Sequence, residues 1–373
     1  MLTSIRISQF YSNNQILLMR DEQTHHALAQ IKRVLENEVA EVKNVANLSE
    51  HHGSQLCAAQ PHMTPWTSWG SQRKPWNQRQ WSQHSTALNK WKKTDAVETM
   101  VHFLDAVITE FIEKLEAYRD SSDRDDQQTF LFMERAYNFA KQNRALGLGA
   151  LGWHSLLQSK RYAFNSQEAY NLNSEIFKEI KERSYKASEQ LAERFGEPEV
   201  LKGYGRRNAT LNAIAPTTSS AFILGQVSQG IEPIWSNCYV KDIAKIKTTI
   251  KNPFLMDLLE EKGQNTAEVW KSIRDMDGSV QHLDFLTEAE KAVFLTYSEL
   301  DQLDIIYQAA NRQNHIDQGQ SVNIIVHPDM PTKEVNKIHV TAWKLGLKSL
   351  YYQHSMNAAQ KFKQKKDCVS CEA

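Results

Sequence analysis

From about residue 91 onward, short segments rich in β-branched residues alternate with longer amphipathic stretches. This alternation limits the folds that the chain can adopt more than any other feature. The strand-like segments are residues 210–215, 321–326 and, more weakly, 346–352. Where strands alternate with helices, each helix can cross over between two parallel strands of one sheet. We therefore expect an α/β fold with parallel strands.

The amphipathic stretches predict helices. In residues 95–118 the apolar side chains recur every three or four positions, so they form one face of a helix. Ser166 has the side chain of an N-cap and Gly196 is a residue type that ends helices, so a long helix is expected between them. The glycine-rich segment 147–152 predicts a tight passage. Further helices are expected at residues 129–143, 265–276, 287–300, 303–313 and 332–345.

Residues 1–90 differ in character, because they are rich in Gln, His and Trp and have weak periodicity. Residues 21–43 carry the apolar period of one helix, whereas residues 51–89 have the composition of a loop. The closely spaced tryptophans of this loop could stack on bases or on a partner. Alternatively, they pack on the rest of the chain from a poorly structured extension, which we favour. Residues 1–90 are therefore left unassigned.

The charge balance excludes several classes of partner. Lys plus Arg and Asp plus Glu number 44 each, so the net charge is +0 and no global field attracts DNA, RNA or an anionic membrane. The sequence has no apolar run near the roughly 18 residues of a membrane span, and no apolar signal core at its start. Four cysteines do not make a secreted disulfide scaffold. We expect a cytoplasmic protein.

One candidate site lies where the 210–215 segment ends. Pro216 follows it, and then come four hydroxyl residues, Thr217, Thr218, Ser219 and Ser220. At the start of a helix, free backbone N–H groups and the helix dipole favour an anion such as phosphate. Simple helix capping is the alternative, although it needs only one such hydroxyl.

A second candidate is the adjacent pair Tyr351 and Tyr352. Successive residues of a regular strand point to opposite faces, so the default expectation is one buried and one exposed tyrosine. A functional pair would require the backbone to leave regular geometry so that the two rings approach each other.

A third candidate is the C-x-x-C pair Cys368 and Cys371 in the charged segment 361–373, which we expect to be a mobile tail. These thiols can form a reversible disulfide, and Lys365 and Lys366 favour the reactive thiolate. A zinc site would need two further ligands, and the sequence has no second C-x-x-C pair. We therefore favour redox chemistry.

Together and in this order, these features resemble the C-terminal part of the large (alpha) subunit of class I ribonucleotide reductase, over about residues 91–373. The matching segments are Arg206-Arg-Asn-Ala-Thr-Leu-Asn-Ala-Ile-Ala-Pro-Thr-Thr-Ser-Ser220 with Gly230-Ile-Glu-Pro233, Asn143-Arg-Ala-Leu-Gly-Leu-Gly149, Asp317-Gln-Gly-Gln-Ser-Val-Asn323 and Leu350-Tyr-Tyr352. The resemblance implies that residues 91–360 form the second half of a ten-stranded α/β barrel. Residues 1–90 would then be a non-homologous N-terminal extension and residues 361–373 a mobile redox tail.

The resemblance also implies roles for the three candidate sites. Thr217, Thr218, Ser219 and Ser220 would hold the diphosphate of a ribonucleoside diphosphate. Tyr351 and Tyr352 would relay a radical from the small (beta) subunit, which would carry the metal centre. Cys368 and Cys371 would pass electrons from thioredoxin or glutaredoxin to the active site. We expect this chain to bind no cofactor itself and to lack the effector sites for ATP or deoxynucleotides.

The radical-forming cysteine of the family does not match any residue here. The family places it in an Asn-x-Cys-x-Glu loop N-terminal to the matching region, where this chain has only Cys57, without that Asn or Glu. Gln83 stands where the family has a second redox cysteine. We interpret Cys57 as an isolated thiol and Cys238 as a buried structural cysteine.

Two hypotheses follow. In the first, an N-terminal large-subunit fragment completes the chain, and the assembly reduces ribonucleoside diphosphates to deoxyribonucleoside diphosphates by a thiyl-radical mechanism. The isolated chain would then be inactive. In the second, the chain is a non-catalytic binding module or remnant that keeps the small-subunit contact but performs no chemistry.

Overall fold

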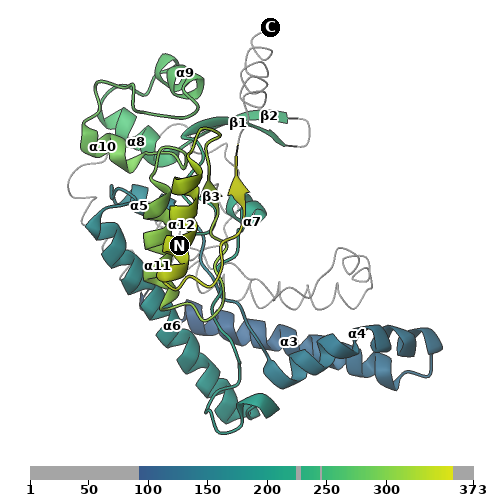
Figure 1. The fold of residues 1–373 in the computed structure, drawn as a ribbon. Helices are drawn as coiled ribbons and strands as arrows, with labels where there is room; N and C mark the ends of the chain where they lie inside the picture. Colours follow the sequence, from purple (N-terminus) through teal and green to yellow (C-terminus); the bar gives the residue numbers. More distant parts are fainter. Residues whose placement is uncertain (1–91, 224–227, 244–245, 356–373) are drawn as a thin grey trace.

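The computed structural model describes residues 92–223, 228–243 and 246–355 (Figure 1). Several predictions therefore fall outside the described residues. They are the possible helix at 21–43, Cys57, the mobile tail, and the dithiol Cys368 and Cys371. No helix in the described part of the chain is long and apolar enough to cross a membrane.

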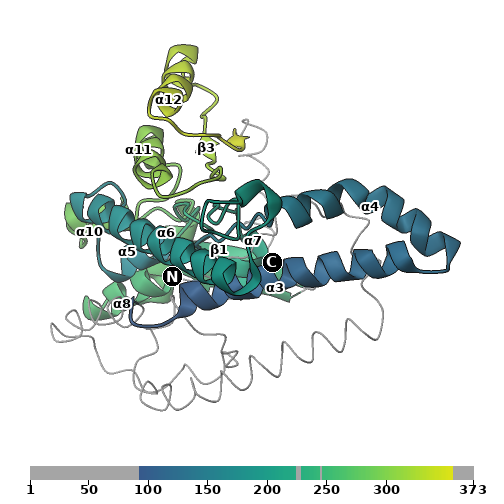
Figure 2. The same cartoon turned by 90° about the horizontal axis from the view of Figure 1, so that it is seen from below.

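Two long helices form a hairpin that projects from the other elements, as Figure 2 shows. They are α3 (Ala96–Asp120) and α4 (Arg124–Asn143). The apolar face expected for α3 is buried, from Val97 to Leu115. α4 begins earlier than residue 129 because the Asp123 carboxylate accepts a hydrogen bond from the Asp125 backbone N–H at 2.8 Å, which caps the helix there.

The longest helix, α6 (Gln167–Phe195), has the two ends that the sequence predicted. The Ser166 hydroxyl accepts from the Ala169 backbone N–H at 3.2 Å, and Gly196 follows the last turn with a φ of 81°. The other helices are α5 (Trp153–Ser159), the 3-10 turn η3 (Glu199–Leu201), α7 (Thr218–Ile223), α8 (Pro253–Glu261), α9 (Ala267–Asp275), α10 (Glu288–Val293), α11 (Gln302–Gln313) and α12 (Thr332–Lys344).

Two helical segments differ from the expectation. The helix expected at residues 287–300 ends at Val293, because the Glu299 carboxylate accepts from the Thr296 backbone N–H at 2.8 Å and forms a separate turn. α8 was not expected. The sequence does carry signals for the start of this helix, since Asn252 caps it and Pro253 stands in its first turn.

In the described residues, four extended segments lie side by side in parallel, in their order along the chain. Leu148 pairs with Asn212, and Ile214 pairs with Gln320. β3 (Ile324–Ile325) then pairs with β4 (Gln353–His354). The parallel α/β architecture is therefore confirmed, and residues 146–148 contribute an extended edge rather than only a tight passage.

The paired segments are shorter than predicted. The backbone N–H groups of Leu211 and Asn212 donate to the Asp317 carboxylate, at 2.7 and 2.8 Å, instead of to a neighbouring strand. The third predicted strand also begins late, because residues near Gly346 still complete the end of α12. An antiparallel hairpin of β1 (Cys238–Ile243) and β2 (Ile246–Lys251) was not expected at all.

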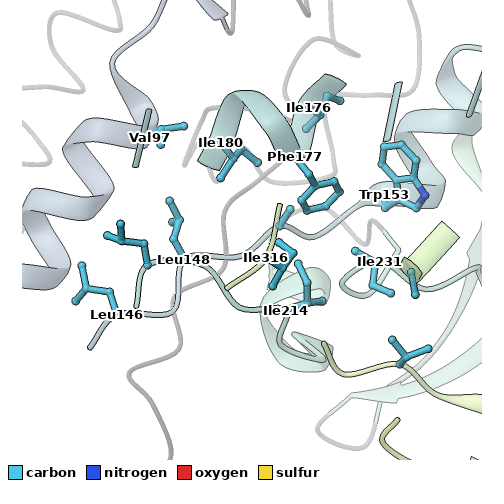
Figure 3. Packing of buried hydrophobic residues seen from close by; sticks show 14 of the residues in the cluster. Val97, Leu146, Leu148, Trp153, Ile176, Phe177, Ile180, Ile214, Ile231 and Ile316 are labelled. Carbon is cyan, nitrogen blue, oxygen red and sulfur yellow. The ribbon is translucent and has the colours of Figure 1, made fainter. Parts of the chain in front are cut away.

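Two apolar clusters hold these elements together. In the larger one, helices α3, α6, α11 and α12 cover the parallel segments, and Leu148, Ile214, Ile316 and Phe177 meet beneath them (Figure 3). The smaller cluster lies among α8, α9 and the β1–β2 hairpin. It includes Cys238, whose burial raises the pKa of the thiol and confirms its prediction as a buried cysteine.

Candidate functional site

The rings of Tyr351 and Tyr352 lie together. Their centroids are 4.1 Å apart with an angle of 51° between the planes, and the two hydroxyl oxygens are 3.5 Å apart. Both side chains are exposed. The approach of the rings that the resemblance implied is therefore confirmed as geometry, and the regular strand alternation expected by default is not followed.

The backbone explains this departure. The Tyr351 N–H donates to the Val322 carbonyl, and the Tyr352 carbonyl accepts from the Ile324 N–H, so both groups face the same neighbour. In a regular strand, these groups of two successive residues face opposite sides. The Tyr352 N–H donates instead to the side-chain Oδ1 of Asn323 at 2.9 Å. β4 begins only after this irregular step, at Gln353.

A buried polar group stands behind the pair. Nδ2 of Asn323 donates to Oε1 of Glu232 at 2.5 Å, and the Asn323 backbone carbonyl accepts from the Tyr297 hydroxyl at 2.6 Å. Burial raises the pKa of Glu232 to about 7, although the Asn323 hydrogen bond opposes this shift. Burial and the nearby Glu232 also raise the pKa of Tyr297 well above its usual range.

More aromatic rings continue from the pair. The Tyr352 ring lies 6.1 Å from that of His354, and the His354 ring lies 5.0 Å from that of Trp235. Trp235 in turn packs against Tyr297, with 5.0 Å between centroids. Aromatic pairs at these separations hold one another in place.

The four hydroxyl residues form the turn into α7. Thr217 has a φ of 55°, a left-handed conformation that is strained for a β-branched residue. Its Oγ1 accepts from the Gly230 backbone N–H at 2.8 Å, and the Thr218 hydroxyl donates to Gln229 Oε1 at 3.2 Å. Thr218 and Ser220 are exposed, and the side chain of Ser219 lies outside the description.

The loop of residues 228–234, here the 228–234 loop, connects this turn to the tyrosine pair. Gly230 lies against the turn so closely that a Cβ atom there would be 2.8 Å from the Ala215 carbonyl oxygen. Two residues later, Glu232 reaches Asn323. The hydroxyl turn and the tyrosine pair therefore share one stretch of backbone.

Helix α5 anchors the 228–234 loop at both ends. At one end, the Ser228 N–H donates to Ser155 Oγ at 2.9 Å and the Ser155 N–H donates to Ser228 Oγ at 3.1 Å. At the other end, the Ile234 N–H donates to His154 Nδ1 at 2.9 Å. Burial lowers the pKa of His154 to about 3, so its ring stays neutral and keeps this acceptor.

Sequence reasoning placed Thr217, Thr218, Ser219, Ser220, Tyr351 and Tyr352 among the candidate residues but assigned no role to Glu232 or Tyr297. Glu232 and Asn323 both lie in segments that resemble the family, but they are 91 positions apart, so no local sequence pattern predicts their contact. Among the described residues, no three His, Cys, Asp or Glu side chains gather as metal ligands would.

Comparison with known proteins identifies this arrangement. A family model described as "Ribonucleotide reductase, barrel domain" matches residues 80–203 and 198–353. The ribonucleoside-diphosphate reductase large subunit of Invertebrate iridescent virus 3 is 40% identical over 255 residues, which cover 64% of this chain and 40% of that protein. A putative ribonucleoside-diphosphate reductase large subunit of Frog virus 3 is 37% identical over 293 residues, or 76% and 50% of the two chains.

Among solved structures, the chain is similar to the class Id ribonucleotide reductase alpha subunit of Actinobacillus ureae. The sequence identity is 52% and the TM-score 0.65, over 73% of this chain and 48% of that one. The chain thus spans about half or less of the length of these relatives. The fold, the matching residues and these similarities together show that the chain belongs to the family of ribonucleotide reductase large subunits, within their barrel domain.

Proposed function

We propose that this chain is the C-terminal portion of a ribonucleotide reductase large subunit. In this proposal a second polypeptide supplies the N-terminal part with the radical-forming cysteine loop, and the assembly reduces ribonucleoside diphosphates to deoxyribonucleoside diphosphates by a thiyl-radical mechanism. The observation that carries the proposal is the close tyrosine pair on an irregular backbone, which shares the 228–234 loop with the hydroxyl turn.

Tyr351 and Tyr352 would relay the radical between the metal centre of the small subunit and the cysteine loop. A phenol that gives up an electron also loses its proton. Since the two hydroxyl oxygens are 3.5 Å apart, the electron and the proton can pass between the rings with little movement. The exposure of both rings leaves them open to a covering subunit.

The hydroxyl turn would hold the substrate diphosphate. The first backbone N–H groups of a helix have no acceptor within it, and Thr218, Ser219 and Ser220 are the first residues of α7. The exposed Ser220 adds a hydroxyl donor. Phosphate oxygens accept from both kinds of group.

Cys368 and Cys371 would restore the active site after each turnover. In that step the two thiols become a disulfide, and their two electrons and two protons reduce a disulfide in the barrel. Thioredoxin or glutaredoxin then reduces the tail again. This cycle requires the reducing cytoplasm, where we place the protein. The product would supply deoxyribonucleotides for DNA replication.

Reconstitution tests the proposal. The chain alone should reduce no ribonucleotide in the presence of small subunit, reductant and effector. Addition of an N-terminal fragment with the Asn-x-Cys-x-Glu loop should give turnover, and Tyr351→Phe or Tyr352→Phe should abolish it. Tyr204→Phe is the control, because Tyr204 is also exposed but lies in the loop after η3.

Two results would contradict the proposal. Turnover by the isolated chain that is lost in Cys57→Ser would make Cys57 the radical site. Binding of the small subunit without turnover in any reconstitution would favour a non-catalytic binding module.

A further inference from the structure

The amide–carboxyl pair of Asn323 and Glu232 has no part in the proposed chemistry, yet it lies directly behind the tyrosine pair. Both residues are buried, with 7% and 3% of their surface exposed. In the described part of the chain, the partner of the Glu232 carboxyl is the Asn323 amide rather than a cation. Burying a carboxyl group without a cation beside it costs free energy. We therefore ask what Glu232 contributes at this place.

The chemistry of the two groups fixes the orientation of the amide. The Glu232 oxygen that carries no proton only accepts hydrogen bonds, so it faces the NH₂ end of Asn323 whether or not the other oxygen is protonated. The carbonyl end of the same side chain is thereby turned toward Tyr352, whose backbone N–H it accepts at 2.9 Å. Glu232 therefore determines which end of Asn323 meets Tyr352.

Because of the irregular backbone step, the Tyr352 N–H donates to the Asn323 side chain and not to a backbone carbonyl. If Asn323 did not accept from it, this N–H would lose its partner, and the strand could return to regular alternation. Regular alternation would send the two rings to opposite faces.

We infer that Glu232 and Asn323 are positioning residues of the tyrosine pair, which together hold the Tyr352 backbone in the conformation that brings the two rings together. The significance of this positioning for radical relay rests on the proposed function. The positioning itself rests only on the contacts of Glu232, Asn323 and Tyr352.

A charge-preserving swap provides the test. Asn323→Asp keeps an acceptor for Tyr352 but removes the amide donor. At about pH 8, above the pKa of about 7 of Glu232, two carboxylates then repel each other and the orientation is lost, so all measurements are made at this pH. Glu232→Gln alone keeps an acceptor for Asn323. In the double variant Glu232→Gln/Asn323→Asp, the glutamine NH₂ donates to the aspartate, whose second oxygen again accepts from Tyr352.

The matched control is Asn165→Asp. Nδ2 of Asn165 donates to Oδ2 of Asp304 at 3.0 Å, so this change also places two carboxyl groups opposite each other. It does so between the start of α6 and the start of α11, away from the tyrosine pair.

The first measurement is fluorine NMR of the full chain with 3-fluorotyrosine at position 352. The ring-current shift is the change in the fluorine resonance when Tyr351 is replaced by Leu. We expect this shift in the unaltered chain, Glu232→Gln, the double variant and Asn165→Asp, and its loss in Asn323→Asp. If Asn323→Asp does not fold, Glu232→Ala removes the orienting acceptor without adding a charge and should also lose the shift.

The second measurement is turnover in the reconstituted assembly. Asn323→Asp should lower kcat about 100-fold with little change in KM, as expected for a misplacement of about 1 Å. The double variant should restore kcat. A shift that persists in Asn323→Asp, or that the double variant fails to restore, would overturn the inference. The expected NMR pattern without turnover in any assembly would leave the positioning role intact and refute the proposed function.

Discussion

At the scale of single residues, the Glu232 carboxyl affects how the fold responds to pH. Its pKa is raised to about 7 by burial, so the folded chain holds this proton at pH values where the unfolded chain has released it. The stabilisation is therefore fully present below about pH 4.5, the value of an unperturbed glutamate, and is lost as the pH rises to about 7.

Glu232→Gln should remove this dependence. Between pH 5 and 8 the free energy of unfolding of the unaltered chain should fall relative to that of the variant, by at most about 3 kcal/mol. Urea unfolding at several pH values measures the difference, and Glu288→Gln, a change at an exposed carboxyl, is the control. Parallel pH profiles for the unaltered chain and Glu232→Gln would show that burial does not shift this group.

The cysteines should differ sharply in reactivity. Cys238 is 3% exposed and burial raises the pKa of its thiol, so a thiol reagent should not modify it in the folded chain. In a Cys57→Ser background, Cys368 and Cys371 should react rapidly with the reagent. Mild oxidation should abolish the reactivity of both thiols together, because they form one disulfide. Thiol titration before and after thioredoxin treatment checks this. Two tail thiols that stay inert in the folded protein would rule out the shuttle.

At the scale of elements, what the sequence could predict depends on how local the cause is. The ends of α6 follow from the chemistry of Ser166 and Gly196, which acts within one helical turn. The short parallel segments do not, because Asp317 binds the backbone of residues more than a hundred positions earlier. The close approach of the Tyr351 and Tyr352 rings was expected from the resemblance alone, since strand periodicity favours the opposite arrangement.

The contact between residues 146–148 and 210–214 depends on Gly149. A Cβ atom there would lie 2.3 Å from the Ala213 carbonyl oxygen, which is a backbone atom and cannot turn away. Gly149→Ala should therefore force the two segments apart and lower the free energy of unfolding by about 1–3 kcal/mol. Gly319→Ala is the control, because the nearest atom there is the Ser349 hydroxyl, which can rotate. Equal denaturation midpoints for the two variants would contradict this account.

At the scale of the whole molecule, the two outermost parallel segments each have one unpaired edge in the described residues. The 146–148 segment pairs with 210–214 on one side, and β4 pairs with β3 on one side. Apolar side chains are also exposed on α4, where Phe132 is 79% exposed. Open strand edges and exposed apolar groups favour association with other chains.

The isolated chain should therefore self-associate, and an N-terminal fragment should both stabilise it and reduce that association. A partner that binds only the folded state raises the melting temperature with its concentration. Light scattering and thermal unfolding, with and without the fragment, measure the two effects. A chain that stays monomeric and keeps the same Tm in excess fragment would contradict completion by a separate polypeptide.

The 228–234 loop has a consequence for anyone who wishes to redesign this protein. Gly230 abuts the hydroxyl turn, and Glu232, two residues later, orients Asn323. Because α5 holds both ends of the loop, a substitution that widens the turn displaces a short, tethered strip of backbone rather than a free one. A change in diphosphate binding and a change in radical transfer would thus occur together, so variants selected for either property should be screened for both.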